Sequence, residues 1–295
     1  MIRQTQRIER KPDAILTADW HLREDTPICF SGDFQKEQWT AVEFVAALQH
    51  QHDCVVLHAG DLFHHWKPSP WLLSMAIQHL PSSFHTVYGQ HDLPQHSTEL
   101  MSKSGLQTLN WAGVANVILQ GHYGQPIREV DALILPQHKE RKILVWHHLT
   151  YQTKPFPGAE GGMAAGILRK YPRFDLIVTG DNHQSFTEEY QGRLLVNPGN
   201  LTRQVADQIN FRPRVYLWYA DTNTVEPVYI PIQEGVISRA HLEVKEQRDS
   251  RIDAFVSGLN KDWAADLSFE QNLEKFKQTN IVRRSVLDLV YKAIG

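Results

Sequence analysis

Five short segments of this chain carry carboxylate and imidazole side chains, and each segment directly follows an apolar run. The segments are Asp19-Trp20-His21, Gly60-Asp61, Gly89-Gln90-His91-Asp92, Trp146-His147-His148 and Gly180-Asp181-Asn182-His183. Carboxylate oxygens and imidazole nitrogens are side-chain ligands that proteins use for Mn²⁺, Mg²⁺ and Zn²⁺. The residue types and their spacing therefore predict one metal site that is assembled from five places in the sequence.

The elements that position these segments are expected to be buried strands. The apolar runs are AILTA before Asp19, CVVLHA before Gly60, FHTVY before Gly89, KILVW before His147 and DLIVT before Gly180. Short runs rich in Val, Ile and Leu that alternate with amphipathic stretches indicate an α/β sheet with helices on its faces. Because ligands collect beyond the carboxyl ends of the strands in such sheets, the five segments are expected to converge on one edge.

The same patterns predict the other elements. Glu37–Gln49 has one apolar face and is expected to be a crossover helix, and a second helix follows Pro70. Further strands are predicted at Asn116–Gln120, Asp131–Leu135, Lys142–Trp146, Leu176–Thr179 and Arg193–Val196. Arg214–Tyr219 and Val225–Ile230 are separated by a turn-like Asp-Thr-Asn and are predicted to form a hairpin.

The order of the motifs, D-x-H, G-D, G-N-H-[DE], H and G-H-x-H, resembles that of the calcineurin-like metallophosphoesterases. The likeness spans most of the first 200 residues. The run GDLFHHWKPS from Gly60 is similar to the SbcD-type nuclease branch of that family, as are HLRED from His21 and NPGNLTR from Asn197. The resemblance implies an α/β fold, a two-sheet sandwich flanked by helices. It also implies a DNA substrate, an ATPase partner of the SbcC type and a homodimer.

The resemblance further implies two sets of metal ligands. They are Asp19, His21, Asp61 and His183 for one ion, and Asp61, Gln90, His147 and Asp181 for the other. Asp61 would bridge the two ions, since a carboxylate can face two cations. Two ions roughly 3.5–4 Å apart can clamp a phosphodiester, activate water and stabilise the leaving oxygen. His148, beside His147, would orient a ligand.

The sequence departs from the family pattern at two of these ligands. Gln90 stands where the family has Asn, and Asp181 stands where it has the first His of G-H-x-H. Both departures fall on the second ion. Replacing imidazole by carboxylate makes that position harder and more negative, which favours Mn²⁺, and also Mg²⁺, over Zn²⁺. The prediction is a functional two-metal site with altered metal selectivity. The alternative is that the second site does not bind metal properly and that the protein is a weak or inactive relative.

Three further residues are candidates for catalysis. His91 would act as general acid or orient the phosphate, a contribution of about 10²–10⁴-fold. Asp92 would either orient His91 or begin a helix. His64 matches a phosphate-contacting histidine of the nuclease branch. Tyr151 and Phe156, in the Gly- and Pro-rich stretch after His147, would either stack on unpaired bases or pack within their own loop.

Composition places limits on function. The net charge of −3 counts against nucleic-acid binding, although bound metal ions add positive charge at the site of the phosphate. Basic residues cluster locally at Lys139, Arg141 and Lys142, at Arg169, Lys170 and Arg173, and at Arg203, Arg212 and Arg214, where solvated faces are the alternative interpretation. Two cysteines form no framework, no apolar run spans a membrane, and the polar N-terminus resembles no signal peptide. These features predict a cytoplasmic protein.

The character of the chain changes after Glu234. Residues 238–292 lose strand signals, and their apolar stripes, together with a helix start at Ser268, predict helices. The expected organisation is a catalytic domain at 1–234 and a helical C-terminal extension at 235–295. In the nuclease branch this region carries a DNA-contacting cap and a partner-binding tail. A reduced cap or partner-docking segment and helices that pack back on the catalytic domain are the two alternatives.

The combined reading is a two-metal phosphodiesterase acting as a DNA exonuclease or endonuclease in repair or recombination. Two rival functions stay open on the same residues. One is a phosphatase that acts on a phosphomonoester or cyclic nucleotide, against which the GDLFHHWKPS run argues. The other is a non-catalytic subunit that keeps the fold and recruits a partner through its helical tail; Gln90 and Asp181 are its only support.

Overall fold

In the computed structural model the chain divides into two compact units, Met1–Ile237 and Ser238–Gly295. The structure describes residues 10–128, 133–136, 138, 140–154, 160–242, 249–252 and 268–294. The division lies between Ile237 and Ser238, whereas the boundary expected from the sequence follows residue 234. Phe156, Lys139 and the first two residues of the predicted strand Asp131–Leu135 lie outside the described residues, as do Phe255, Val256 and Leu259 of one predicted helical stripe. The rest of that predicted strand forms an isolated bridge, from Leu133 to Ile143.

A six-stranded sheet, ordered β12-β11-β1-β2-β3-β4, forms the first half of the larger unit. Its strands are β1 (Ala14–Thr17), β2 (Val55–His58), β3 (Phe84–Thr86), β4 (Asn116–Val117), β11 (Arg214–Tyr219) and β12 (Thr224–Tyr229). Strands β1 to β4 pair in parallel, and β11 is antiparallel to both of its neighbours. The predicted hairpin of β11 and β12 thus joins the sheet through β1.

A second sheet of four strands has the order β5-β8-β10-β9. Its strands are β5 (Ile143–Trp146), β8 (Leu176–Thr179), β9 (Phe186–Tyr190) and β10 (Arg193–Asn197), and a separate ladder pairs β6 (Thr150–Tyr151) with β7 (Gly162–Met163). Strand β9 was not predicted. Its sequence, FTEEY, lacks an apolar run because it is a half-buried edge strand.

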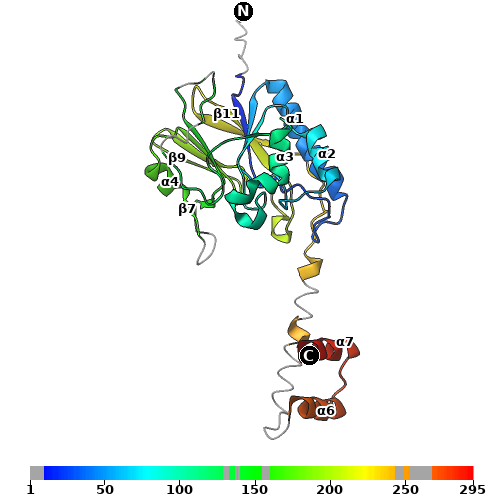
Figure 1. The fold of residues 1–295 in the computed structure, drawn as a ribbon. Helices are drawn as coiled ribbons and strands as arrows, with labels where there is room; N and C mark the ends of the chain where they lie inside the picture. Colours follow the sequence, from blue (N-terminus) through cyan, green and yellow to red (C-terminus); the bar gives the residue numbers. More distant parts are fainter. Residues whose placement is uncertain are drawn as a thin grey trace, which may run out of the picture. The chain divides into compact units, whose positions relative to one another are not determined.

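Helices cover the outer faces of both sheets, which gives four layers (Figure 1). Helices α1 (Phe34–His52), α2 (Pro70–His79) and α3 (Gly105–Trp111) lie on the six-stranded sheet, and α4 (Ala164–Lys170) lies on the four-stranded sheet. Alternation along the strands builds these layers: Ile15 faces the helices, whereas Leu16 faces the core between the sheets. The predicted α/β sandwich flanked by helices is therefore confirmed.

Short 3-10 helices complete the larger unit. They are η1 (Pro94–His96), η2 (Thr98–Lys103) and η3 (Ala206–Gln208). The first two follow the Gly89-Gln90-His91-Asp92 segment, and the third follows the Asn197 fragment. None of these turns was expected from the sequence, because short turns lack the periodicity that marks a longer helix.

The parallel strands bring the predicted site segments to one edge. Strand register aligns Thr17 with His58 and His58 with Thr86, so the chain leaves β1, β2 and β3 at the same level. In the other sheet, Trp146 of β5 is aligned with Thr179 of β8. The segments that follow these residues are the five that carry the predicted ligands.

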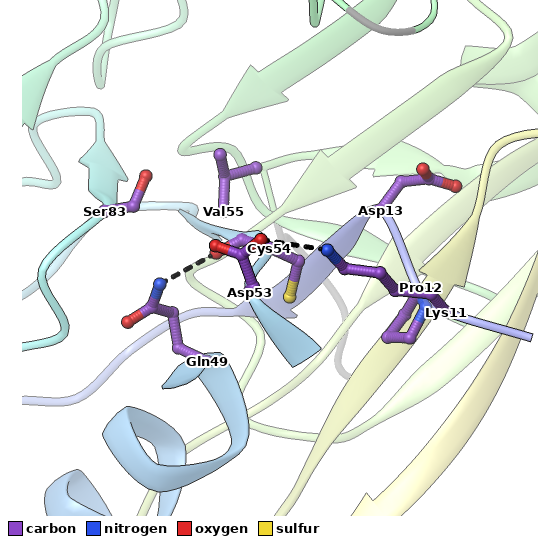
Figure 2. Close-up of a pocket in the computed structure, with 8 residues that line it drawn as sticks. All are labelled: Lys11, Pro12, Asp13, Gln49, Asp53, Cys54, Val55 and Ser83. Carbon is purple, nitrogen blue, oxygen red and sulfur yellow. Dashed lines mark hydrogen bonds and ion pairs between the residues drawn. The ribbon is translucent and has the colours of Figure 1, made fainter. Parts of the chain in front are cut away.

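A pocket of about 410 Å³ lies at the opposite edge, where β1 and β2 begin (Figure 2). Lys11 and Asp53, which line it, form an ion pair with a nitrogen–oxygen distance of 3.0 Å. The Gln49 amide beside them donates to the Cys54 carbonyl at 3.0 Å. None of the residues predicted for the metal site lines this pocket.

The smaller unit contains the predicted helices around Ser268. Ser268 caps α6 (Phe269–Thr279) in a capping box with Gln271, and α7 (Arg284–Ile294) follows. Leu273 and Phe276 form its buried core, with further apolar residues of both helices packed against them. No helix in the described ranges combines the length and apolar character that a membrane crossing requires.

A buried ion pair connects α1 to the Asn197 fragment. Glu37 and Arg203 have side chains that are each 2% exposed, and their charged atoms lie 3.5 Å apart. The Gln233 backbone binds both: its N–H donates to the Glu37 carboxylate at 2.9 Å, and its carbonyl accepts from the Arg203 guanidinium. Arg203, noted in the sequence as part of a basic cluster, therefore has a structural role.

Substituting Glu37→Gln is expected to destabilise the protein by about 3–5 kcal/mol, because it leaves the buried Arg203 charge uncompensated. Urea unfolding followed by tryptophan fluorescence measures this change. Glu43→Gln, on the same helix, is the matched control. The Glu43 side chain is 58% exposed beside His79, so its loss should change stability by less than about 0.5 kcal/mol. Equal effects of the two substitutions would contradict the assignment.

Candidate metal centre

The loops that follow β1 and β2 run side by side and carry the first predicted ligands. Backbone N–H groups of Asp19, His21 and Leu22 donate to the carbonyls of Gly60, Asp61 and Leu62 at 3.0, 3.0 and 2.8 Å. This short ladder fixes the Asp19-Trp20-His21 segment against the Gly60-Asp61 segment. Asp19, His21 and Asp61 are all buried at its end. The sequence order of these motifs alone gave no register between them.

Four predicted ligands adopt left-handed backbone conformations. The φ angles are 50° at Asp19, 46° at His21, 57° at Asp61 and 76° at Asp181. Non-glycine residues rarely adopt such angles, and those that do cluster at functional sites, where the strain costs of order 1–3 kcal/mol each. The turns therefore aim these side chains inward at the expense of local stability.

Two glycines in the motifs are required by close approach. A Cβ atom at Gly89 would overlap the Asp61 carboxylate, and one at Gly60 would lie 2.5 Å from His147 Nδ1. Gly60 also has a φ of 90°, which side chains disfavour. The glycines of G-D and G-Q-H-D therefore let loops from two sheets approach the same carboxylate.

The first predicted ligand set converges on a small volume. His21 Nε2 lies 3.2 Å from His183 Nε2 and 3.7 Å from Asp61 Oδ2. Two imidazoles bound at 2.0–2.1 Å to one ion would have nitrogens about 3.0–3.4 Å apart. Asp19, His21 and His183 also form a group whose ligand atoms lie within 4.8 Å of one another. This geometry fits one divalent ion.

The second predicted set surrounds His147. Its Nδ1 lies 2.7 Å from the Ala59 carbonyl, which can only accept, so Nδ1 carries the proton and Nε2 faces the site. His147 Nε2 lies 2.6 Å from Gln90 Oε1 and 3.5 Å from Asp61 Oδ2. Three electron-pair donors therefore converge, and a cation among them would relieve their mutual repulsion.

Asp61 joins the two sets. Its Oδ1 accepts from the His91 N–H at 2.8 Å, whereas its Oδ2 is buried and has no hydrogen-bond partner among the described residues. That Oδ2 atom lies 3.7 Å from His21 Nε2 and 3.5 Å from His147 Nε2. A buried carboxylate oxygen without a partner is costly unless a cation meets it. The residues present thus fit the bridging position expected of Asp61.

Asp181 contacts both sets without belonging to a three-ligand group. Its backbone N–H donates to Asp19 Oδ1 and Oδ2 at 3.0 and 3.1 Å. Its side chain accepts from Gln90 Nε2 at 2.6 Å. The described residues form three groups of potential metal ligands, and Asp181 is in none of them. The two residues that depart from the family pattern are therefore hydrogen-bonded to each other.

Burial sets the protonation of the site in the absence of metal. Burial raises the pKa of Asp19 to about 8 and raises the pKa of Asp61 well above its usual value. Burial lowers the pKa of His183 to about 4, and it lowers the pKa of His21 well below its usual value. The imidazoles are thus neutral at physiological pH, which is the state that binds metal ions.

His91 and His64 lie beside the first set. His21, His64 and His91 form a third group of ligand-type atoms, and the His64 and His91 rings stack with centroids 5.5 Å apart. His91 Nδ1 lies 2.9 Å from the His64 carbonyl, so Nδ1 is the donor and Nε2 is free to meet a substrate. Burial lowers the pKa of His64 to about 4.

Asp92 braces the backbone of these loops. Its buried carboxylate accepts from the N–H groups of Leu62, Phe63 and Gly89 at 3.2, 3.0 and 3.1 Å. The orienting contact to His91 comes from the His64 carbonyl instead. The sequence predicted that Asp92 would either orient His91 or begin a helix. Its contacts fit neither role.

Other residues near the site were predicted differently or missed. His148 stacks on Trp146 with centroids 3.9 Å apart, and Tyr151 is buried in β6. Asn197, which the sequence marked only as part of NPGNLTR, donates to the carbonyls of Asn182 and Gln184 at 2.5 and 2.7 Å. It thereby braces the loop that carries His183. The carbonyls of Ala59 and His64 had no sequence signal, because any residue supplies a carbonyl.

Comparison with known proteins identifies the family. The model of the calcineurin-like phosphoesterase superfamily domain matches residues 15–212 of this chain. The chain belongs to this superfamily. Members of the family use divalent metal ions, in agreement with the grouped ligands, and the chain is thus a metal-dependent phosphoesterase by family. No curated protein matches the sequence.

Solved structures give weaker likenesses. An archaeal phosphodiesterase is 13% identical with a TM-score of 0.40, covering 73% of this chain and 98% of its own. A putative 5'-nucleotidase from Staphylococcus aureus is 12% identical with a TM-score of 0.41. The match covers 81% of this chain and 58% of the nucleotidase. A metallophosphoesterase from Sphaerobacter thermophilus is 14% identical with a TM-score of 0.38. The match covers 75% of this chain and 89% of that protein. The family assignment rests on the sequence match.

Metal binding to this calcineurin-like phosphoesterase is expected to release protons from carboxyl groups. Because the pKa of Asp19 is raised to about 8, its proton must leave before the carboxylate can bind an ion at lower pH. Mn²⁺ affinity should therefore rise by at least about tenfold per pH unit below pH 8, since the pKa of Asp61 is raised as well. Calorimetric titrations from pH 6 to 9, in buffers of different ionisation enthalpy, measure both effects. Affinity that did not change with pH would contradict the assignment.

Proposed function

We propose that this calcineurin-like phosphoesterase is a two-metal phosphodiesterase that cleaves DNA, as an exonuclease or endonuclease in repair or recombination. The observation that carries the proposal is the position of Asp61 Oδ2, 3.7 Å from His21 Nε2 and 3.5 Å from His147 Nε2. One carboxylate oxygen within reach of an imidazole from each predicted ligand set is the arrangement that a pair of bridged cations requires. The choice of DNA as substrate rests on the Gly60–Ser69 run, which resembles the SbcD-type nuclease branch.

The two metal positions would share Asp61 and differ in their other ligands. Asp19, His21, Asp61 and His183 would hold one ion, and Asp61, Gln90 and His147 would hold the other, with Asp181 beside Gln90. Carboxylate, amide and imidazole donors favour Mn²⁺, with Mg²⁺ as the alternative. When bound, the ions would supply positive charge for the phosphoryl oxygens and lower the pKa of water.

The remaining residues of the site position and protonate the substrate. His91 directs Nε2 toward the site because the His64 carbonyl holds its Nδ1 at 2.9 Å. Its role would be to donate a proton from Nε2 of the doubly protonated ring to the leaving sugar oxygen, which leaves the neutral ring with its proton on Nδ1. His64, whose pKa is lowered by burial to about 4, is neutral at physiological pH and would contact the phosphate without adding charge. Its buried Nδ1 has no hydrogen-bond partner in the part of the chain that the structure describes.

Support for DNA over a small phosphate ester comes from the Gly60–Ser69 run. That run places His64 three residues after the bridging Asp61 and beside His91, so the feature that resembles the nuclease branch lies in the site itself. An SbcC-type ATPase partner, a homodimer and a cytoplasmic location belong to the same proposal and rest on the resemblance.

His91→Ala is expected to lower DNA cleavage by about 10²–10⁴-fold while metal binding persists, because it removes the proton donor and leaves the ligands in place. Linear double-stranded and single-stranded DNA would be incubated with Mn²⁺, Mg²⁺ or no added metal. His50→Ala, an exposed histidine on α1, is the matched control and should retain the wild-type rate.

A parallel assay separates the rival functions. A phosphomonoester and a cyclic nucleotide would be offered under the same conditions. Hydrolysis of either, without degradation of DNA, would overturn the nuclease proposal in favour of a phosphatase or a small-ester phosphodiesterase. No hydrolysis of any substrate by metal-loaded protein would favour a subunit without catalytic activity of its own.

A further inference from the structure

The hydrogen bond between Gln90 and Asp181 determines which way the Gln90 amide points. Asp181 Oδ1 is a carboxylate oxygen and can only accept, so the amide end that lies 2.6 Å from it must be the NH₂ group. The amide oxygen is thereby directed to the other side, where it lies 2.6 Å from His147 Nε2. Asp181 thus fixes a side chain that could otherwise rotate by half a turn.

The orientation it imposes is unfavourable unless a cation is present. His147 Nδ1 donates to the Ala59 carbonyl, so in the neutral ring Nε2 presents a lone pair. Gln90 Oε1 presents lone pairs to the same space, and Asp61 Oδ2 lies 3.5 Å from Nε2. If Asp181 were absent, the amide could turn its NH₂ group toward His147 and relieve the repulsion. Asp181 prevents this and keeps an oxygen available to a metal ion.

The contacts of Asp181 itself are those of a supporting residue. Its Oδ1 is occupied by Gln90, and its backbone N–H donates to both oxygens of Asp19. Among the described residues it joins no group of three ligand-type atoms within 4.8 Å, although Asp19, Asp61 and His147 form one. Asp181 therefore connects a ligand of one ion to a ligand of the other.

We propose that Asp181 is a positioning residue that orients Gln90 toward the second metal ion, in place of the ligand that the family pattern has at this position. The second ion would then have three protein ligands, Asp61, Gln90 and His147, and a larger share of its coordination open to water or substrate. The inference rests on the proposed two-metal site, but it makes no use of the substrate.

Titration of the metal-free full-length protein with Mn²⁺ tests the inference without any activity assay. Calorimetry would give the affinity for each ion, and electron paramagnetic resonance would count exchange-coupled Mn²⁺ pairs. Asp181→Ala should weaken the second ion about 10–100-fold, as expected for loss of a group that orients a ligand. Asp181→Asn keeps an oxygen acceptor and should stay within about fivefold of wild type. If Asp181→Asn weakened the second ion as much as Asp181→Ala, the proposal would be overturned.

A double-mutant cycle gives the sharper test. Because Asp181 acts through Gln90, adding Asp181→Ala to Gln90→Ala should leave the second-ion affinity unchanged from that of Gln90→Ala alone. Additive losses would show direct binding by Asp181 and overturn the proposal. Unchanged binding of the first ion in every variant is the control for folding. If an alanine variant fails to fold, the conservative Asp181→Asn variant replaces it in the comparison with wild type.

The outcomes separate this inference from the proposed function. Binding of only one Mn²⁺ by the wild type would overturn both the two-metal site and the role of Asp181. Two coupled Mn²⁺ ions with the expected cycle, in a protein that degrades no DNA, would uphold the role of Asp181 and reject the nuclease. Cleavage of DNA together with additive losses of affinity in the double-mutant cycle would uphold the nuclease and reject the positioning role of Asp181.

Discussion

The burial of the Asp61 carboxylate is the constraint on which the site depends. One of its oxygens accepts from the His91 N–H, while the other lies within 3.7 Å of two imidazole nitrogens and has no hydrogen-bond partner within the described ranges. Such a group is unfavourable in a protein interior without a compensating cation. Loops from both sheets are arranged around this single oxygen, and a divalent ion is what makes their arrangement favourable.

The surrounding structure supplies the rigidity that this arrangement requires. Glycines at 60 and 89 leave room for close approach, and Asp92 uses its buried carboxylate to bind three backbone N–H groups of the same loops. The left-handed turns at the ligands store strain that the two packed sheets offset. The site is thus preorganised by contacts among residues that never meet a substrate.

Polar contacts of two kinds set the chemistry. Backbone carbonyls of Ala59 and His64 fix the tautomers of His147 and His91, so one ring nitrogen of each is directed into the site. A side-chain contact orients Gln90: its amide NH₂ group donates to the Asp181 carboxylate. Burial keeps His21 and His183 neutral and favours protonated Asp19, which couples metal binding to proton release.

Sequence alone predicted most strands of the two sheets, helices α1 and α2 and the group of ligand-type residues, but not α3 or α4, because apolar periodicity and short motifs are local properties that short helices show weakly. It could not predict the edge strand β9, whose alternation is too weak, nor the burial of Arg203 against Glu37. Only the tertiary structure decided that Asp92 braces the backbone and that Gln90 and Asp181 bind each other. Asp92 binds backbone groups 29 and 30 positions earlier in the chain, and Gln90 and Asp181 are 91 positions apart. The geometry of such contacts depends on how the strands and the two sheets pack.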